Sequence, residues 1–154
     1  MASGLRSKKP HAPPSPALHV LPLFLLSGVL LVLSFPSVNQ PICAWVALVP
    51  WLLALRDISR RRAWWSSYLV GLVFFLGSMW WLTKLTAFGG WVAILGWLAL
   101  CAYLALYFAL FGWFVSSFTV HRSPFTMLVG VPAAWVVFEF ARTHLLSGLG
   151  WNLL

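Results

Sequence analysis

Two ionisable side chains near the end of this sequence stand in apolar surroundings and could do chemistry there. Glu139 and Arg142 are three residues apart and follow an apolar run that extends from Met127 to Phe138. On a helix this spacing places both side chains on one face, where they reach each other. The spacing alone favours a self-neutralising pair, because both groups lie close enough to the helix end to be hydrated. The alternative is a functional pair, because ionisable groups in membrane segments mark substrate or relay sites.

The other reactive residues of the sequence do not fall into a catalytic pattern. Cys43 and Cys101 lie in separate apolar runs, without the spacing of a metal site and without a histidine nearby to act as a base. Asp57 and Glu139 are the two acidic residues of the chain, which nearly excludes a paired-carboxylate site. Glycine-rich phosphate loops and serine–histidine–acid sets are absent from the sequence. We therefore expect no catalytic residue, no metal and no cofactor in these residues.

The composition indicates a membrane protein. Hydrophobic residues make up 62% of the 154 residues, and charged residues make up 8%. A soluble domain of this length leaves too much of its surface in water to hide so many apolar side chains, so lipid must be the solvent for most of the chain. The formal net charge is +8, but the basic residues form short clusters between apolar runs, as membrane topology requires. We therefore expect membrane lipids with anionic head groups, and no nucleic acid, as partners of these charges.

The order of the apolar runs predicts an all-α, polytopic membrane protein with about five transmembrane helices. Residues 1–16 are basic and rich in proline, which predicts a disordered cytoplasmic tail, whereas residues 17–154 are expected to form the helical membrane domain. The second apolar run, CAWVALVPWLLAL, is short for a span, but the basic cluster that follows it favours a crossing with a kink near Pro50. The expected helices cover residues 17–33, 43–55, 63–82, 91–118 and 124–146.

The basic residues also predict the orientation of these helices. The segment RDISRRRA follows the second run, and a crossing places it on the same cytoplasmic side as the basic N-terminal tail. The N-terminus and the loops at Asp57 and Arg122 are then inside. The positions expected outside are Asn39, Gly89 and Ser147.

Small residues and tryptophans add detail to this prediction. Ser67 and Gly71 are four residues apart in the third helix, which permits close contact with another helix. The FGG sequence at residues 88–90 predicts a flexible external turn. Tryptophan pairs at residues 64–65 and 80–81 are expected at the two membrane interfaces that bound the third helix.

Five sequence blocks resemble, in their order, the N-terminal membrane region of bacterial apolipoprotein N-acyltransferase. Together they cover nearly the whole chain from Leu33 onward with compatible spacing. The most specific block combines E-x-x-R, at Glu139 and Arg142, with G-x-x-W-N at residues 148–152. The blocks are LSFPSVNQPICAWVALVPWLLALRD, GLVFFLGSMWWL, FGG, YLALYFALFGW and PAAWVVFEFARTHLLSGLGWNLL.

The resemblance implies a multi-pass enzyme of lipoprotein biosynthesis in the bacterial inner membrane. Such an enzyme takes an acyl chain from a membrane phospholipid and holds it as a thioester on a cysteine. It then passes the acyl chain to the N-terminal amine of a lipid-modified cysteine in an apolipoprotein. The family's catalytic Glu, Lys and Cys lie in a periplasmic, nitrilase-like α/β domain placed within a bundle of eight membrane helices. The implied partners are therefore the phospholipid donor and the apolipoprotein.

This sequence departs from the family pattern because it ends at Leu154, before the nitrilase-like domain. Cys43 and Cys101 do not match the context of the catalytic nucleophile. Lys84 and Glu139 do not match the catalytic lysine and acid. We therefore expect a truncated chain that does not transfer acyl groups on its own, because thioester chemistry needs an activated nucleophile.

The residues best placed for substrate contact are Arg142 and Trp151, with Glu139 as the partner of the arginine. A guanidinium can hold a phosphate with two hydrogen bonds, which suits a phospholipid donor. The alternative function is that of a non-enzymatic membrane protein, such as a small transporter or a scaffold. A transporter predicts charged or polar residues at mid-membrane in several helices, whereas only the fifth expected helix carries charge, near one end.

Overall fold

A computed structural model gives the fold of the chain and describes residues 16–35, 40, 42–56, 58–118 and 124–144. All regular structure in these residues is helical, and no strand occurs among them. The all-α prediction is therefore confirmed for this part of the chain. Most of the expected N-terminal tail lies outside the described residues, as do four of the expected loop positions, Asn39, Asp57, Arg122 and Ser147.

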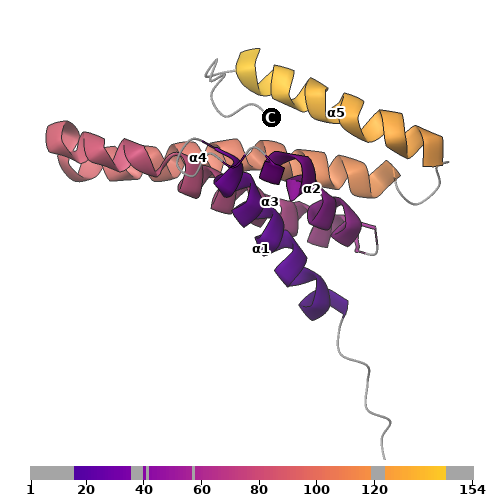
Figure 1. The fold of residues 1–154 in the computed structure, drawn as a ribbon. Coiled ribbons are helices and arrows are strands. Elements are labelled where there is room, and N and C mark those ends of the chain that lie inside the picture. Colours follow the sequence, from indigo (N-terminus) through magenta and orange to yellow (C-terminus); the bar gives the residue numbers. More distant parts are fainter. Residues whose placement is uncertain (1–15, 36–39, 41, 57, 119–123, 145–154) are drawn as a thin grey trace, which may run out of the picture.

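The helices follow the order of the apolar runs, with one additional short helix (Figure 1). Helix α4 is the longest element, and both α3 and α5 pack against it. In the view of Figure 1, α1, α2 and α3 lie on one side of α4 and α5 lies along the other. The elements are α1 (Pro16–Ser34), α2 (Ile42–Ala54), α3 (Arg60–Ser78), the 3-10 helix η1 (Trp80–Leu85), α4 (Thr86–Phe118) and α5 (Pro124–His144).

Helix α3 is displaced toward the N-terminus relative to the expected span of residues 63–82. Ser59 has an extended backbone (φ −66°, ψ 152°), and its carbonyl accepts the Ala63 N–H at 2.9 Å, so the helix begins at Arg60. Arginine is a good helix former, whereas hydropathy marks only the apolar part of a helix. At the other end Met79 leaves the helical conformation. The tryptophan pair at residues 80–81, which was expected at the end of the third helix, consequently lies in η1 and not in α3.

Helix α4 contains a break at Gly90, where the backbone has φ 57° and ψ −145°. Residues with a Cβ rarely adopt such a conformation, and glycine adopts it readily. A change of chain direction within the turn predicted at residues 88–90 is therefore confirmed, at Gly90, whereas its flexibility and its external position stay predictions. The helix beyond it ends at Phe118, as expected for the span of residues 91–118.

The described residues differ in their capacity to cross a bilayer. The stretch Trp80–Ser117 is both long and apolar enough to do so. Val20–Ser34 and Ile42–Ala54 are apolar but shorter. The 13 residues of α2 extend about 20 Å, which is less than the roughly 30 Å of a hydrocarbon core. The number of spans therefore stays a prediction.

A serine of α1 forms two hydrogen bonds to the backbone of α2. The Ser27 hydroxyl donates to the Ala47 carbonyl at 2.6 Å, and the Trp51 N–H donates to Ser27 Oγ at 2.9 Å. Residues 47 and 51 are four apart, which is the spacing of one backbone hydrogen bond in an α-helix. The preceding residue, Pro50, has no N–H and disturbs the turn before it. Ser27 thus bridges the donor and the acceptor of one helical turn of α2 beside Pro50, where the sequence predicts a kink.

Helices α3 and α4 approach each other closely at small residues. A Cβ on Gly71 would lie 2.8 Å from Phe108 Cβ and 3.0 Å from Ala105 Cα. A Cβ on Gly112 would collide with the Ser67 hydroxyl. The close helix contact predicted from Ser67 and Gly71 is therefore confirmed, and it positions the aromatic residues of α4 against α3.

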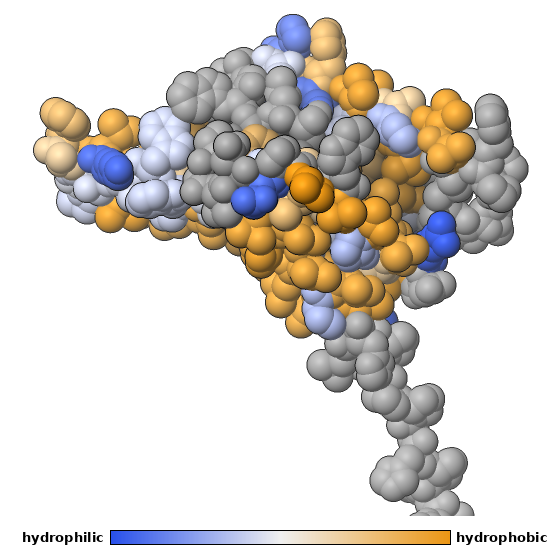
Figure 2. Space-filling model, viewed as in Figure 1, coloured by the Kyte–Doolittle hydropathy of each residue, from blue (hydrophilic) through white to orange (hydrophobic). Residues whose placement is uncertain are grey.

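Much of the described surface is apolar. On the face shown in Figure 2, hydrophobic residues cover most of the described surface, and hydrophilic residues occupy a few separate places. Large apolar side chains are exposed on several helices, including Leu25 on α1, Leu98 on α4 and Phe140 on α5. Extended apolar surfaces of this kind indicate contact with a membrane or with other protein.

Candidate functional site

The ion pair predicted from the sequence is present on α5. Arg142 Nη2 lies 3.9 Å from Glu139 Oε1, a longer distance than the roughly 2.7–2.9 Å of a charge-assisted hydrogen bond. The Arg142 side chain is 4% exposed and the Glu139 side chain is 16% exposed. The expectation that both groups are hydrated near the helix end is therefore wrong for Arg142. The packing of α5 turns this guanidinium toward α3 and away from the surface.

The guanidinium of Arg142 lies over an aromatic ring of another helix. Its Cζ is 5.4 Å from the ring centroid of Phe75 on α3, within the range of a cation–π contact. Burial of a charge costs several kcal/mol unless it is compensated. The Glu139 carboxylate and the Phe75 ring both provide such compensation, so the sequence can hold a permanent cation among apolar helices.

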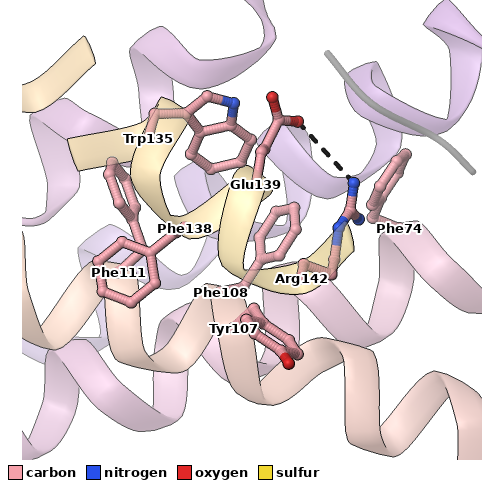
Figure 3. Close-up of a pocket in the computed structure, with 8 residues that line it drawn as sticks. All are labelled: Phe74, Tyr107, Phe108, Phe111, Trp135, Phe138, Glu139 and Arg142. Atoms are coloured by element: carbon pink, nitrogen blue, oxygen red, sulfur yellow. Dashed lines mark ion pairs between the residues drawn. The ribbon is translucent and has the colours of Figure 1, made fainter. Parts of the chain in front are cut away.

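The pair borders a small pocket between α3, α4 and α5 (Figure 3). Its cavity volume is about 20 Å³, which is close to the room that one water molecule needs. In this form the pocket has no room for a phosphate group or an acyl chain. Its walls are formed by Phe74, Tyr107, Phe108, Phe111, Trp135, Phe138, Glu139 and Arg142.

One face of α5 supplies half of these walls. Trp135, Phe138, Glu139 and Arg142 recur at positions i, i+3, i+4 and i+7, which is the spacing of a single helix face. Figure 3 shows the indole of Trp135 on the same part of α5 as the Glu139 carboxylate. The same face thus carries both the anchoring rings and the charged pair.

Trp135 anchors this face of α5 to the helices beneath it. Its ring lies edge-on to Phe111 at a centroid distance of 5.0 Å, to Phe108 at 5.4 Å and to Trp51 at 6.0 Å. Each such pair contributes about 0.5–1.5 kcal/mol beyond simple burial. Trp135 therefore fixes the rotation of α5 that places Glu139 and Arg142 at the pocket.

The structure brings two of the three predicted site residues together. Glu139 and Arg142 share the pocket, whereas Trp151 lies outside the described residues, so its place beside them stays a prediction. Sequence reasoning missed Trp135 and Tyr107. The helical spacing from residue 135 to 142 was a usable signal for the first. The signal for Tyr107 was its position four residues after Tyr103, which places both rings on one face of α4; their hydroxyl oxygens lie 2.8 Å apart.

The site can hold or neutralise an anionic group, because its guanidinium is a permanent cation. The cysteines of the chain lie elsewhere: Cys101 is buried in α4 and Cys43 is half-buried in α2. Across the described ranges, no three His, Cys, Asp or Glu side chains come together as a metal site would require. What the described residues offer at this pocket is a buried guanidinium beside a carboxylate.

Comparison with known proteins gives the family of the chain. The family described as apolipoprotein N-acyltransferase N-terminal domain matches residues 27–154. The match begins within α1 and includes every later helix. The chain is also similar to curated proteins that are each named apolipoprotein N-acyltransferase.

Three of these relatives show the extent of the similarity. The protein of Geobacter metallireducens is 36% identical over 133 residues, which cover 84% of this chain and 25% of that protein. The protein of Pasteurella multocida is 31% identical over 82% of this chain and 24% of its own length. The protein of Chlorobaculum tepidum is 33% identical over 82% and 23%. The chain thus spans about a quarter of the length of the relatives that it matches, and it belongs to the apolipoprotein N-acyltransferase family through their N-terminal domain.

Proposed function

We propose that this chain supplies the membrane-embedded N-terminal part of an enzyme that moves an acyl chain from a phospholipid to the N-terminal cysteine of apolipoproteins. The match of the family's N-terminal domain to residues 27–154 is the observation that carries this proposal. The helical fold, the apolar surface and the membrane-length stretch Trp80–Ser117 support it. The proposed location is the bacterial inner membrane, crossed several times.

The 154 residues alone are proposed not to complete acyl transfer. A thioester requires an activated cysteine, and Cys101 is fully buried in α4. The matched relatives are about four times as long as the matched region. Expression of this chain in cells that lack the full enzyme should leave lipoproteins diacylated, whereas a full-length relative in the same cells should restore the third acyl chain. Triacylated lipoprotein in cells with this chain alone would contradict the proposal.

Within that enzyme, Glu139, Arg142 and Trp151 are proposed to contact the phospholipid donor or to form the entrance through which it arrives. The buried guanidinium supports this role, because it is a cation held at a pocket between three helices. A pocket with room for one water cannot admit a phosphate unless α5 shifts, so the proposal requires movement of α5 when the donor binds.

A double replacement separates this role from simple charge neutralisation. The experiment uses a full-length relative whose N-terminal region is replaced by this chain, so that the nitrilase-like domain and the remaining helices are present, and compares Arg142→Met, Glu139→Gln and the two together. If the arginine only neutralises the glutamate, the double variant should be nearly harmless, because no charge is stranded. We expect the double variant to lose acyl transfer at a normal protein level. Full activity in the double variant would refute the donor contact and leave a structural ion pair.

The alternative of a small transporter gains no support from the described helices. Helices α1, α2 and α4 contain no Asp, Glu, Lys or Arg. A transporter of charged or polar solutes is expected to place such groups at mid-membrane in several helices.

A further inference from the structure

A second and larger cavity lies where the first turns of α1 meet the start of α3. Its volume is about 370 Å³, within the roughly 300–1,000 Å³ of small-molecule sites. None of its lining residues belongs to the Glu139–Arg142 pocket. The cavity is therefore a separate candidate site with room for a head group, in contrast to the pocket on α5.

One side of this cavity is cationic and polar. Arg61, Arg62 and Ser66 of α3 line it, and both arginines are exposed. The first turn of α3 contains no acidic residue. Two guanidinium forks and a hydroxyl provide the donors that hold a phosphate group. The charge of the lining therefore selects an anionic ligand.

The other side of the cavity is apolar and continues along the outside of α1. Leu21 lines the cavity and is 42% exposed. Leu25 and Val29 follow at i+4 and i+8, on the same face of the helix, and are 40% and 47% exposed. The three side chains form a strip about 12 Å long that begins at the arginines. A free phosphate would leave this strip uncovered, whereas an acyl chain would cover it.

Trp65 gives the cavity a further feature of a membrane interface. This residue lines the cavity and is 61% exposed. Exposed tryptophans are favoured at the level of lipid head groups, where one end of the ring is apolar and the other can donate a hydrogen bond. The two arginines, the Trp65 indole and the apolar strip therefore follow one another as the phosphate, the interfacial region and the acyl chain of a phospholipid do.

We propose that this cavity binds an anionic phospholipid. Its phosphate lies between Arg61, Arg62 and Ser66, and one acyl chain lies along Leu21, Leu25 and Val29. The lipid thereby joins the start of α1 to the start of α3. This binding does not depend on acyl transfer, and the residues involved are not those proposed to contact the acyl donor.

The test uses the purified 154-residue chain in a neutral detergent and counts bound molecules by native mass spectrometry. The ligands are short-chain phosphatidylglycerol, phosphatidylcholine of the same chain length, and glycerol phosphate. We expect phosphatidylglycerol to bind more tightly than the other two. Equal binding of phosphatidylcholine would overturn the role of the negative charge, and equal binding of glycerol phosphate would overturn the role of the acyl chain.

Two arginine variants of equal charge distinguish a built site from a generally basic surface. Arg61→Gln with Arg62→Gln should weaken phosphatidylglycerol binding by roughly tenfold or more, because it removes charge-assisted hydrogen bonds. Arg56→Gln with Arg60→Gln removes the same charge from exposed residues that do not line the cavity and should have a much smaller effect. Equal loss in the two variants would overturn the proposal.

A third variant fills the cavity without changing its charge. Ser66→Phe places a ring where the phosphate is proposed to lie, so we expect it to abolish tight phosphatidylglycerol binding. Retained binding in this variant would contradict the site even if the arginine variants failed to fold.

Discussion

The two members of the α5 ion pair are unequally buried, so we expect their removal to have unequal costs. Glu139→Gln removes a carboxylate 3.9 Å from a guanidinium that is 4% exposed, so it takes away part of the compensation of a buried charge and should cost at most about 3–5 kcal/mol. Arg142→Met leaves Glu139, which is 16% exposed and therefore lies nearer to the surface. Its cost should therefore be smaller. Unfolding of the purified chain in detergent measures both costs, and a larger loss for Arg142→Met would contradict the assigned burial.

The hydrogen bonds of Ser27 to the backbone of α2 give a second prediction about a single residue. Ser27→Ala removes the buried bonds from its hydroxyl to the Ala47 carbonyl and from the Trp51 N–H to its oxygen, each worth about 0.5–1.5 kcal/mol. Ser34→Ala is the matched control, because the Ser34 hydroxyl bonds only within α1, to the Leu31 carbonyl. Thermal unfolding should show a large loss for the first variant and a small one for the second. Similar losses would mean that the Ser27 hydroxyl is not important for α2.

The sequence predicted the charged pair but not the walls around it, for a physical reason. Glu139 and Arg142 could be paired because their spacing is local to one helix. Phe74 and Tyr107 reach the same pocket from other helices, and the apolar runs that carry them are hydrophobic on every side. Such helices have no polar face to show which side turns inward. Only packing of the whole bundle decides it.

At the scale of the elements, the close contact of α3 with α4 predicts opposite effects for two glycines. Gly71→Ala should destabilise the protein, because its Cβ would lie 3.0 Å from the Ala105 Cα and the backbone would have to shift. Gly96→Ala, with nothing within 4 Å of its Cβ, should stabilise α4 by up to about 1 kcal/mol through helix propensity. The free energy of unfolding in detergent compares the two. A gain in stability for Gly71→Ala would show that the helices do not approach this closely.

The boundaries of the elements were predictable where a residue type restricts the backbone. Gly90 has a positive φ, and the FGG sequence marked that turn in advance. The start of α3 at Arg60 was not predictable from hydropathy, because charged residues are counted against a membrane helix although they favour helical backbone. The 3-10 helix η1 was not predicted either. Its tryptophans are as apolar as the residues before them, so hydropathy shows no boundary at that point.

For the molecule as a whole, the two faces of α5 have different surroundings. Trp135 and Arg142 face the other helices, whereas Val136, Val137 and Phe140 are 63%, 64% and 62% exposed. An apolar face of this kind must meet lipid or further protein. The chain spans about a quarter of the length of its relatives, and contact of this face with lipid or with further protein is compatible with that. A further property of the whole molecule is the orientation of the helices in the membrane.

The basic residues predict that orientation, and two introduced cysteines test it. Arg60 belongs to the basic cluster after α2, and the positive-inside rule places this cluster in the cytoplasm. Gly89 lies beyond the other end of α3, at the turn before Gly90, and is exposed. Its φ is not positive, so a cysteine there fits the backbone. In a chain whose Cys43 and Cys101 are replaced by alanine, Gly89→Cys should react with a membrane-impermeant maleimide in intact spheroplasts. Arg60→Cys should react only after the membrane is opened.

The outcome also decides whether the short helix α2 crosses the membrane. Its 13 residues reach about 20 Å, so a crossing requires the flanking residues or a locally thin bilayer to provide the rest. If α2 turns back instead, the basic cluster is outside with position 60, and α3 carries position 89 to the inside. Labelling of position 60 with protection of position 89 would therefore refute the crossing. The opened membrane serves as the control, because both positions are exposed in the fold and should then react.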